Sequence, residues 1–170
     1  MCENTSAAVQ IISSTSYRCP GGPEKSSSSW CKMFAASNVL YDANLENKNG
    51  AKKWANFWLA EQKKAGEEQG FIMSLGCNKR VRGVELRNTH AATPRDRSTK
   101  KFRILGSVAR DGPWQELLVA KLEDARHQHP PPLQQLMFSN SAVVSFVKFE
   151  LFEFYGLGGG LQYFALVEGG

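Results

Sequence analysis

The chain consists of short apolar runs separated by polar, glycine-rich or proline-rich stretches. The clearest alternation sets Val147, Phe149 and Leu151 against Lys148 and Glu150, the period of two expected of a strand with one buried face. Further runs bounded by turn residues predict more strands, and together the predicted strands are Val9–Ser14, Phe71–Leu75, Val81–Asn88, Lys101–Ser107, Leu133–Phe138, Val143–Leu151 and Leu161–Val167. The pattern therefore predicts an all-β fold.

One turn signal indicates how the strands are joined. Asp111-Gly112 lies shortly before Trp114, and Asp-Gly is a dipeptide that favours a tight hairpin turn. A hairpin joins antiparallel strands, so we expect the sheet to be antiparallel.

Two segments show a helical period instead. In Ala51–Ala65 the residues Ala51, Trp54 and Trp58 recur at helical spacing among lysines, which is compatible with a short amphipathic helix or turn. We favour burial of both tryptophans in the core over an interfacial membrane helix, because the segment is short and flanked by domain sequence. Trp114–Arg126 also fits a helix period and contains good helix formers, so helix and strand compete there.

Length and composition indicate how many domains to expect but do not indicate the cellular compartment. The 170 residues are 42% hydrophobic and 22% charged, which is typical of one globular domain with a sizeable core. No apolar run approaches the roughly 20 residues that cross a bilayer, and the first residues lack the features of a signal peptide. We therefore predict no transmembrane segment. An extracellular or cell-surface location is favoured if a signal peptide was removed, and an intracellular one stays open.

Four cysteines are present. Cys19 and Cys31 bracket a loop rich in Gly, Pro and Ser that cannot pack a core, so a disulfide there would restrict a loop that is otherwise entropically unfavourable to order. The sequence is compatible with either a disulfide between these two cysteines or two free thiols. Cys77 follows Gly76 near a strand end and is interpreted as a small buried apolar group, and Cys2 lies near a terminus.

The segments that come nearest to catalytic or phosphate-binding motifs lack residues that those motifs require. The glycine-rich segment Gly156–Leu161 has Leu where a dinucleotide-binding fingerprint has Gly or Ala, and a predicted strand follows it, so we expect a flexible connection between strands. His127 and His129 have no second pair at zinc spacing and are interpreted as solvated loop residues. The sequence therefore predicts that the protein is not an enzyme.

Charge is concentrated in one stretch. Between Lys79 and Arg103 there are nine Lys and Arg against two acidic residues, a local +7 in a chain of net charge +5. Such a density would attract sulfated glycans, anionic lipid headgroups or nucleic acid, unless the charges are spread over solvated strand faces. Nucleic acid is the weakest of these partners, because few aromatic residues are interleaved for base stacking.

Several motifs in the same order resemble the discoidin family, the coagulation factor V/VIII type C domains. The central match runs through VRGVELRNTH, RDRSTKKFRI, Asp111-Gly112 and Trp114. Phe34–Asp42 is similar to the family's early "PAxNLLDG" segment, and Val147–Leu151 with Gly160–Phe164 resembles its last strands. The resemblance covers about Val9 to Val167 and implies one domain over residues 1–170 with the galactose-binding jelly-roll fold, an antiparallel β-sandwich. It also makes Gln115–Lys121 a strand.

The resemblance implies a non-catalytic module that recognises a glycan, or another cell-surface or extracellular ligand, through loops at one end of the jelly roll. The alternative is a module that binds anionic phospholipid or docks a protein in a larger assembly. The matching loops are Thr15–Met33, His90–Arg95 and Phe154–Gly160, and the candidate ligand-binding residues on them are Tyr17, Arg18, Trp30, His90, Arg95 and Tyr155.

Related carbohydrate-binding modules also hold a structural calcium ion near a turn that corresponds to Asp42 and Asn44. Hard oxygen ligands suit calcium. Gln162 stands where those modules often have a glutamate, so complete calcium coordination is not implied.

Overall fold

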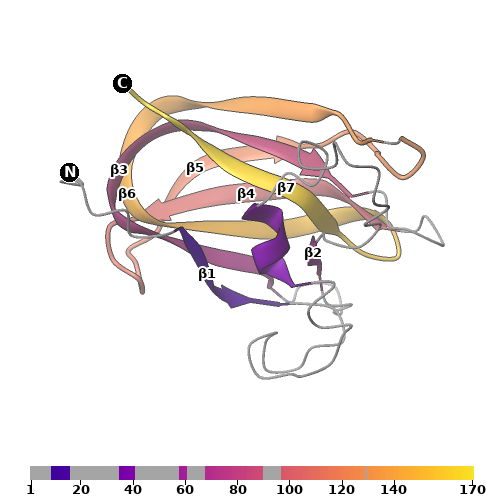
Figure 1. The fold of residues 1–170 in the computed structure, drawn as a ribbon, viewed down its shortest axis with the longest axis horizontal. Helices are drawn as coiled ribbons and strands as arrows, with labels where there is room; N and C mark the ends of the chain where they lie inside the picture. Colours follow the sequence, from indigo (N-terminus) through magenta and orange to yellow (C-terminus); the bar gives the residue numbers. More distant parts are fainter. Residues whose placement is uncertain (1–8, 16–34, 41–57, 61–67, 90–96, 129) are drawn as a thin grey trace, which may run out of the picture.

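The computed structural model describes residues 9–15, 35–40, 58–60, 68–89, 97–128 and 130–170 (Figure 1). This part of the chain is built almost entirely of strands and contains one short 3-10 helix and no α-helix. The elements are β1 (Gln10–Ser14), η2 (Ala36–Leu40), β2 (Trp58–Leu59), β3 (Gln69–Asn88), β4 (Arg97–Ser107), β5 (Gln115–Lys121), β6 (Leu133–Gly156) and β7 (Gly160–Glu168).

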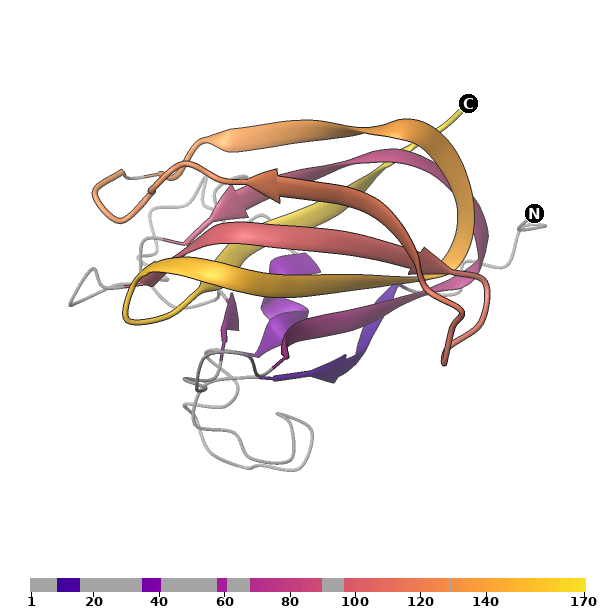
Figure 2. The same ribbon diagram turned by 180° about the vertical axis from the view of Figure 1, so that it is seen from behind.

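All pairings between these strands are antiparallel, which confirms the predicted fold class. The strand order is β2-β7-β3-β6-β4-β5, with β1 also paired to β3. β3 and β6 change neighbours halfway along their length, so the strands form two packed layers. Figures 1 and 2 show both strands curving around one end of the molecule, which we call the bend end.

The first layer, named the first sheet, runs β1, β3 (69–74), β6 (146–156), β4, β5. The second sheet runs β6 (133–144), β3 (79–88), β7, β2. Pairing between β3 and β6 is interrupted where the two strands cross from one layer to the other: Ser74 is opposite Phe146, and the next pair is Lys79 with Val144. Gly76, with φ of +75°, lies in this interruption and allows the left-handed backbone that the bend uses.

This continuity corrects two sequence predictions. Phe71–Leu75 and Val81–Asn88 were predicted as separate strands, but both lie in β3, and the Gly-Cys turn between them is a bulge within one strand. Leu133–Phe138 and Val143–Leu151 likewise lie in β6. A period of two identifies each half of a bent strand but does not reveal that the two halves are continuous.

Other strand predictions are confirmed. Gln115–Lys121 forms β5 and pairs with β4, which excludes the competing helix. Asp111 and Gly112 lie in the connection of this hairpin, where Gly112 has a φ of +93°.

Aromatic side chains fill the space between the sheets. Phe71, Phe149 and Phe102 belong to the first sheet and form a stack, with ring centroids 5.3 Å apart for Phe71 and Phe149 and 5.1 Å for Phe102 and Phe149. Trp58 and Phe164 of the second sheet meet this stack edge-on. Such edge-to-face contacts add about 0.5–1.5 kcal/mol each beyond area burial. The predicted burial of Trp58 is confirmed, while Trp54 lies outside the described residues.

Candidate functional site

Segments that are distant in the sequence meet at the end of the sandwich opposite the bend. We call this region the loop end and define it by the described residues Thr15, Asn88–Thr89, Arg97–Lys100, Leu122–Arg126 and Tyr155–Gly160. Thr15 follows β1 and hydrogen bonds to Gly70 at the start of β3, and it accepts a hydrogen bond of 2.9 Å from Trp58 Nε1. The end of β3, the start of β4 and the β6–β7 connection are joined there by side-chain hydrogen bonds.

Asn88 is the centre of this network. Its side chain is fully buried, and its Nδ2 donates to the carbonyl oxygens of Thr99, at 2.8 Å, and Glu123, at 2.9 Å. Its Oδ1 accepts from the backbone N–H groups of Thr99, at 2.8 Å, and Thr89, at 3.0 Å. One amide side chain therefore satisfies backbone groups from three segments where the strands end, as buried polar groups require. Sequence reasoning missed this role, because an Asn at a strand end is an ordinary turn signal.

Thr99 and Ser98 extend the network to the glycine-rich connection. Thr99 Oγ1 donates to the Gly160 carbonyl oxygen at 2.7 Å and accepts from the Gly160 N–H at 3.2 Å. The Ser98 N–H donates to the Gly158 carbonyl oxygen at 3.0 Å. A Cβ atom on Gly158 would lie 2.6 Å from Nη1 of the buried Arg97, so the connection passes close to that guanidinium. The connection joins two strands as predicted, and these hydrogen bonds hold it against β4.

Tyr155 is the one candidate ligand residue within the described part of the chain. Its hydroxyl donates to the Leu122 carbonyl oxygen at 3.1 Å, and its half-buried ring has Arg126 and Lys100 on it, each with its cationic group 5.9 Å from the ring centroid. Leu157, two residues further on, is 59% exposed. The loop end thus presents an aromatic ring, two cations and an apolar tip.

Arg126 is held in place by a bidentate ion pair with Asp124. Its Nε donates to Oδ1 at 3.0 Å and its Nη2 to Oδ2 at 2.7 Å. This hydrogen-bonded pairing lowers the pKa of Asp124 and raises that of Arg126. Both groups are therefore charged at neutral pH, and the guanidinium is held beside the Tyr155 ring.

The other predicted ligand residues cannot be placed. Tyr17, Arg18, Trp30, His90 and Arg95 lie outside the described residues, as do the loops Thr15–Met33 and His90–Arg95 beyond Thr15 itself. The flanking residues Thr15, Thr89 and Arg97 all belong to the loop end, so both loops are attached at the same end as Tyr155.

The predicted calcium ligands Asp42 and Asn44 also lie outside the described residues. Gln162 is 8% exposed, and its buried Oε1 has no hydrogen-bond partner within the described part of the chain. An unpartnered buried carbonyl oxygen suits a hard cation, so Gln162 fits as one neutral ligand. The described residues contain no group of three or more His, Cys, Asp or Glu that could hold a metal.

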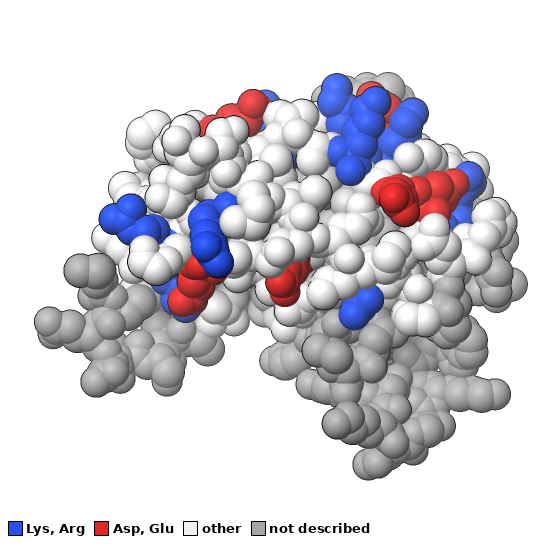
Figure 3. Space-filling model, turned by 90° about the horizontal axis from the view of Figure 1, so that it is seen from above, with Lys and Arg blue, Asp and Glu red and all other residues white. Residues whose placement is uncertain are grey.

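The basic stretch from Lys79 to Arg103 is dispersed by the fold. Lys79 pairs with Glu168 of β7 at 2.6 Å, and Lys100 pairs with Glu153 of β6 at 3.1 Å. Arg103 pairs with Glu150 of β6 and lies 3.8 Å from Glu116 of β5. Figure 3 shows one face on which Lys and Arg form separate groups with Asp and Glu nearby. Lys79, Lys100 and Arg103 of the predicted concentration of charge are therefore each neutralised by an acidic residue on a neighbouring strand.

Ion pairs on the outer side of the first sheet form a row that we call the charge ladder: Glu68, Lys148, Glu150, Arg103 and Glu116. Glu150 is 5% exposed. Burial alone would raise the pKa of Glu150, but hydrogen bonds from Lys148 and Arg103 outweigh it and hold the pKa below its usual value. Burial would lower the pKa of Lys148, and its bonds to Glu150 and Glu68 raise it overall.

Cys77 is disulfide-bonded and only half-buried, which corrects its interpretation as a small buried apolar group. The other three cysteines, Cys2, Cys19 and Cys31, lie outside the described residues, so the predicted Cys19–Cys31 bridge stays a prediction. Within the described part of the chain, no helix is long and apolar enough to span a membrane.

Comparison with solved structures confirms the fold that the resemblance implied. The C-terminal domain of a Bacteroides fragilis chitobiase matches with a TM-score of 0.65 at 12% identity, over 96% of this chain and 95% of its own. The module CpGH89CBM32-5 of Clostridium perfringens, solved with GalNAc-β-1,3-galactose, matches with a TM-score of 0.59 at 15% identity, over 94% of both chains. The family 32 carbohydrate-binding module of C. perfringens NanJ, solved with galactose, matches with a TM-score of 0.57 at 11% identity, over 94% of this chain and 91% of its own.

The chain therefore has the β-sandwich fold of family 32 carbohydrate-binding modules, which belong to the discoidin, galactose-binding-like group. No family model and no curated protein matches its sequence.

Proposed function

We propose that this chain is a non-catalytic recognition module that binds a glycan at the loop end. The observation that carries the proposal is the convergence of Tyr155, Arg126 and Lys100 on a buried hydrogen-bonded base at the end where two further candidate loops are attached. An aromatic ring can stack on the apolar face of a sugar, while adjacent cations donate to hydroxyl or carboxylate oxygens. The solved modules of this fold that bind galactose or GalNAc-β-1,3-galactose support the choice of ligand.

A rigid base matters because recognition by loops loses affinity when the loops must be ordered on binding. The Asn88 network connects the roots of the candidate loops, and the Asp124–Arg126 pair positions one cation before a ligand arrives. We therefore expect the loop end to be preorganised at its described base, with Trp30, Tyr17, Arg18, His90 and Arg95 as the proposed contacts from the remaining loops.

The test is a glycan array followed by calorimetry on the best-bound sugar. Tyr155→Ala should weaken binding by about tenfold to a hundredfold, the range for losing a central interface aromatic. Tyr155→Phe removes the hydroxyl bond to Leu122 but keeps the ring, so it should retain most of the affinity. Phe152→Ala is the matched control, because Phe152 is a 47% exposed aromatic that contacts Arg103 of the charge ladder.

Equal effects of Tyr155→Ala and Phe152→Ala would show that the ring at the loop end is not a contact. In the remaining loops, Trp30→Ala should weaken binding by about 1–3 kcal/mol if an aromatic contact dominates. If charge dominates, Arg95→Ala should have the larger effect and affinity should fall steeply with salt.

One observation favours a second candidate, binding of anionic phospholipid. Leu157 is 59% exposed and follows two residues after Tyr155, whose ring Arg126 and Lys100 contact, and an exposed apolar residue near cations also suits insertion at a lipid interface. Co-sedimentation with phosphatidylserine liposomes distinguishes the two functions: Leu157→Ser should abolish lipid binding and leave glycan binding unchanged. If neither glycans nor liposomes bind, a protein-docking role in a larger assembly becomes the preferred function.

Calcium stays a proposal with Asp42, Asn44 and Gln162 as its ligands. When bound, the ion would supply structural cross-linking by oxygen coordination and no chemistry. The midpoint of thermal unfolding should rise when calcium is added to chelator-treated protein, and Gln162→Glu should enlarge that rise by adding a charged ligand. An unfolding midpoint independent of calcium in both proteins would exclude the ion.

A further inference from the structure

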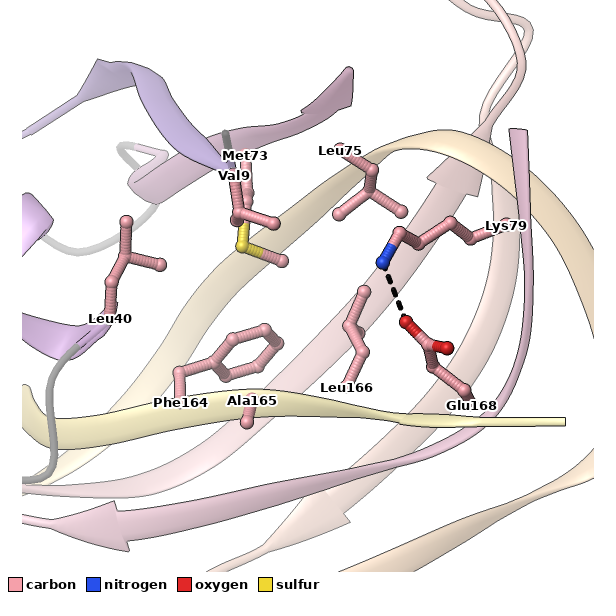
Figure 4. A pocket seen from close by; sticks show the side chains of 9 residues that line it. All are labelled: Val9, Leu40, Met73, Leu75, Lys79, Phe164, Ala165, Leu166 and Glu168. Carbon is pink, nitrogen blue, oxygen red and sulfur yellow. Dashed lines mark hydrogen bonds and ion pairs between the residues drawn. The ribbon is translucent and has the colours of Figure 1, made fainter. Parts of the chain in front are cut away.

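A cavity of about 310 Å³ lies between the two sheets, on the side of the sandwich bordered by β1, η2 and β7. Figure 4 shows side chains from both sheets around the space, and its apolar wall includes Val9, Leu40, Met73, Leu75, Phe164 and Leu166. Its volume is within the range of small-molecule sites. None of its lining residues belongs to the loop end, so it is distinct from the proposed glycan site.

Charge enters this cavity at one end only. Among the described residues, Lys79 and Glu168 are the two charged residues of its lining, and Lys79 Nζ contacts Glu168 Oε1 at 2.6 Å (Figure 4). The other lining residues that the structure describes are all apolar. A ligand that matches this distribution has an apolar body and a single charged head.

The described part of the lining disfavours a sugar as the occupant. A pyranose carries hydroxyl groups around its ring, and each hydroxyl buried against Met73, Leu75 or Phe164 would lose its hydrogen bonds to water without replacement. An unbranched alkyl chain has no such groups and gains from leaving water. Met73 favours this occupant further, because its flexible thioether adapts to a slender chain.

The sign of the head group follows from the exposure of the two charged residues. The Lys79 side chain is 32% exposed and the Glu168 side chain 64% exposed. Glu168 can turn into water with little loss, because exposed ion pairs contribute little to stability. Lys79 would then meet the ligand's head, while its aliphatic stem stays against the cavity wall. A second cation, Arg80, lies beside Gly169 at this end of β7.

We propose that the cavity binds an unbranched aliphatic carboxylate, with the alkyl chain between the sheets and the carboxylate on Lys79 Nζ in place of Glu168. This binding is independent of glycan recognition at the loop end. Three expectations follow: affinity rises with the length of the alkyl chain, it requires a negatively charged head group, and removing the charge of Lys79 or of Glu168 has opposite effects on it.

Calorimetry on the full chain with sodium decanoate, below its micelle concentration, tests the claims. Affinity should rise by about twofold to fourfold per methylene from hexanoate to decanoate, the gain expected from burying one methylene. Lys79→Gln should weaken decanoate binding about tenfold or more, and Lys79→Arg should restore most of it. Glu168→Gln should strengthen binding, since it frees Lys79. Lys101→Gln is the matched control, because it removes a β4 lysine that does not line the cavity.

Leu166→Trp narrows the cavity without changing its charge and should also weaken binding. Thermal unfolding of each variant separates lost binding from lost fold. The proposal is overturned if decylammonium binds as tightly as decanoate, if Lys79→Gln leaves the decanoate affinity unchanged in a folded protein, or if no alkyl carboxylate binds the wild-type chain.

Discussion

The loop end and the charge ladder both bury polar groups, but they satisfy them by different means. At the loop end the neutral Asn88 amide bonds to backbone groups from separate segments. On the first sheet, the buried Glu150 carboxylate is satisfied by the cations Lys148 and Arg103. A neutral network keeps its geometry across pH, whereas an ionic one depends on protonation. The comparison teaches that the Asn88 network at the base of the loop end is insensitive to pH changes that alter the sheet face, whereas the Asp124–Arg126 pair at the same end is ionic like the charge ladder.

The same difference explains why the basic stretch is a weak functional signal. Arg103 of that stretch neutralises Glu150, and Lys79 and Lys100 neutralise Glu168 and Glu153. Charges used in this way have less capacity to attract a polyanion. At the loop end Lys100 and Arg126 are likewise paired with Glu153 and Asp124, but both also lie on the Tyr155 ring, where a ligand can use their remaining donors.

The largest expected effect on stability comes from breaking a covalent bond, and it concerns the whole fold, including both regions. Reducing the disulfide of Cys77 should lower the free energy of unfolding by about 2–4 kcal/mol, because the bond restricts the unfolded chain. β1 lies antiparallel on β3 with Gln10 opposite Ser74 and Ser14 opposite Phe71, so the end of β1 that is nearer Cys2 in the sequence is also the end nearer Cys77. We therefore expect non-reducing peptide mapping to link Cys77 with Cys2 and Cys19 with Cys31, and a Cys77–Cys19 or Cys77–Cys31 peptide would contradict this pairing.

Asn88→Ala should produce the largest loss among non-covalent changes. It leaves buried backbone groups of Thr89, Thr99 and Glu123 without partners, so we expect a decrease of about 2–4 kcal/mol in the free energy of unfolding, measured in urea. The decrease should be the same at pH 5 and pH 7, because no member of the network titrates. Asn140→Ala, an exposed asparagine on β6, is the control and should change stability little. A loss that varies with pH would remove the contrast with the charge ladder.

Glu150→Gln should lower stability by about 1–3 kcal/mol at pH 7, because two charge-assisted hydrogen bonds weaken. The pKa of Glu150 is lowered on folding, so its stabilisation is fully present above its unfolded pKa and disappears as pH falls through the lower folded value. Wild-type stability should therefore fall in acid below about pH 4.5, the ordinary pKa of Glu. The variant should lose part of this dependence. If the free energy of unfolding falls with pH by the same amount in both proteins, Glu150 is not the group responsible.

The smallest expected effect comes from the exposed pair of Lys100 and Glu153. Its partners are 40% and 46% exposed, so water screens their attraction. Glu153→Gln should leave the unfolding midpoint in urea unchanged within error, although a hydrogen bond from Lys100 lowers the pKa of Glu153. A loss as large as that of Glu150→Gln would mean that burial is not what distinguishes the ladder from an ordinary surface pair.

Local pattern was sufficient to predict most of the strands, although β5 needed the family resemblance and the short β2 was not predicted. Alternation placed Val147, Phe149 and Leu151 on a buried face, and all three are buried. The turn at Asp111 and Gly112 was predicted for the same reason, since a turn depends on a few adjacent residues. The ordered motifs also implied the jelly roll, and the fold comparison confirms it.

Candidate ligand residues were predicted by family likeness, and Tyr155 is the one that the described structure places at the loop end. Its two cationic neighbours were not predicted as a set, because Lys100, Arg126 and Tyr155 come from separate segments. Asn88 was missed for a similar reason: its partners Thr99 and Glu123 lie 11 and 35 residues away in the sequence.

By itself, the sequence determined what depends on neighbours along the chain: the strand period, the turn residues and the order of family motifs. Only the tertiary structure decided that β3 and β6 run unbroken through both sheets, that Arg103 is paired with Glu150 from 47 residues away, and that Lys79 and Glu168 close one end of an apolar cavity. The physical reason is that side-chain alternation is a local property, whereas pairing and enclosure depend on which distant segments the folded chain brings into contact.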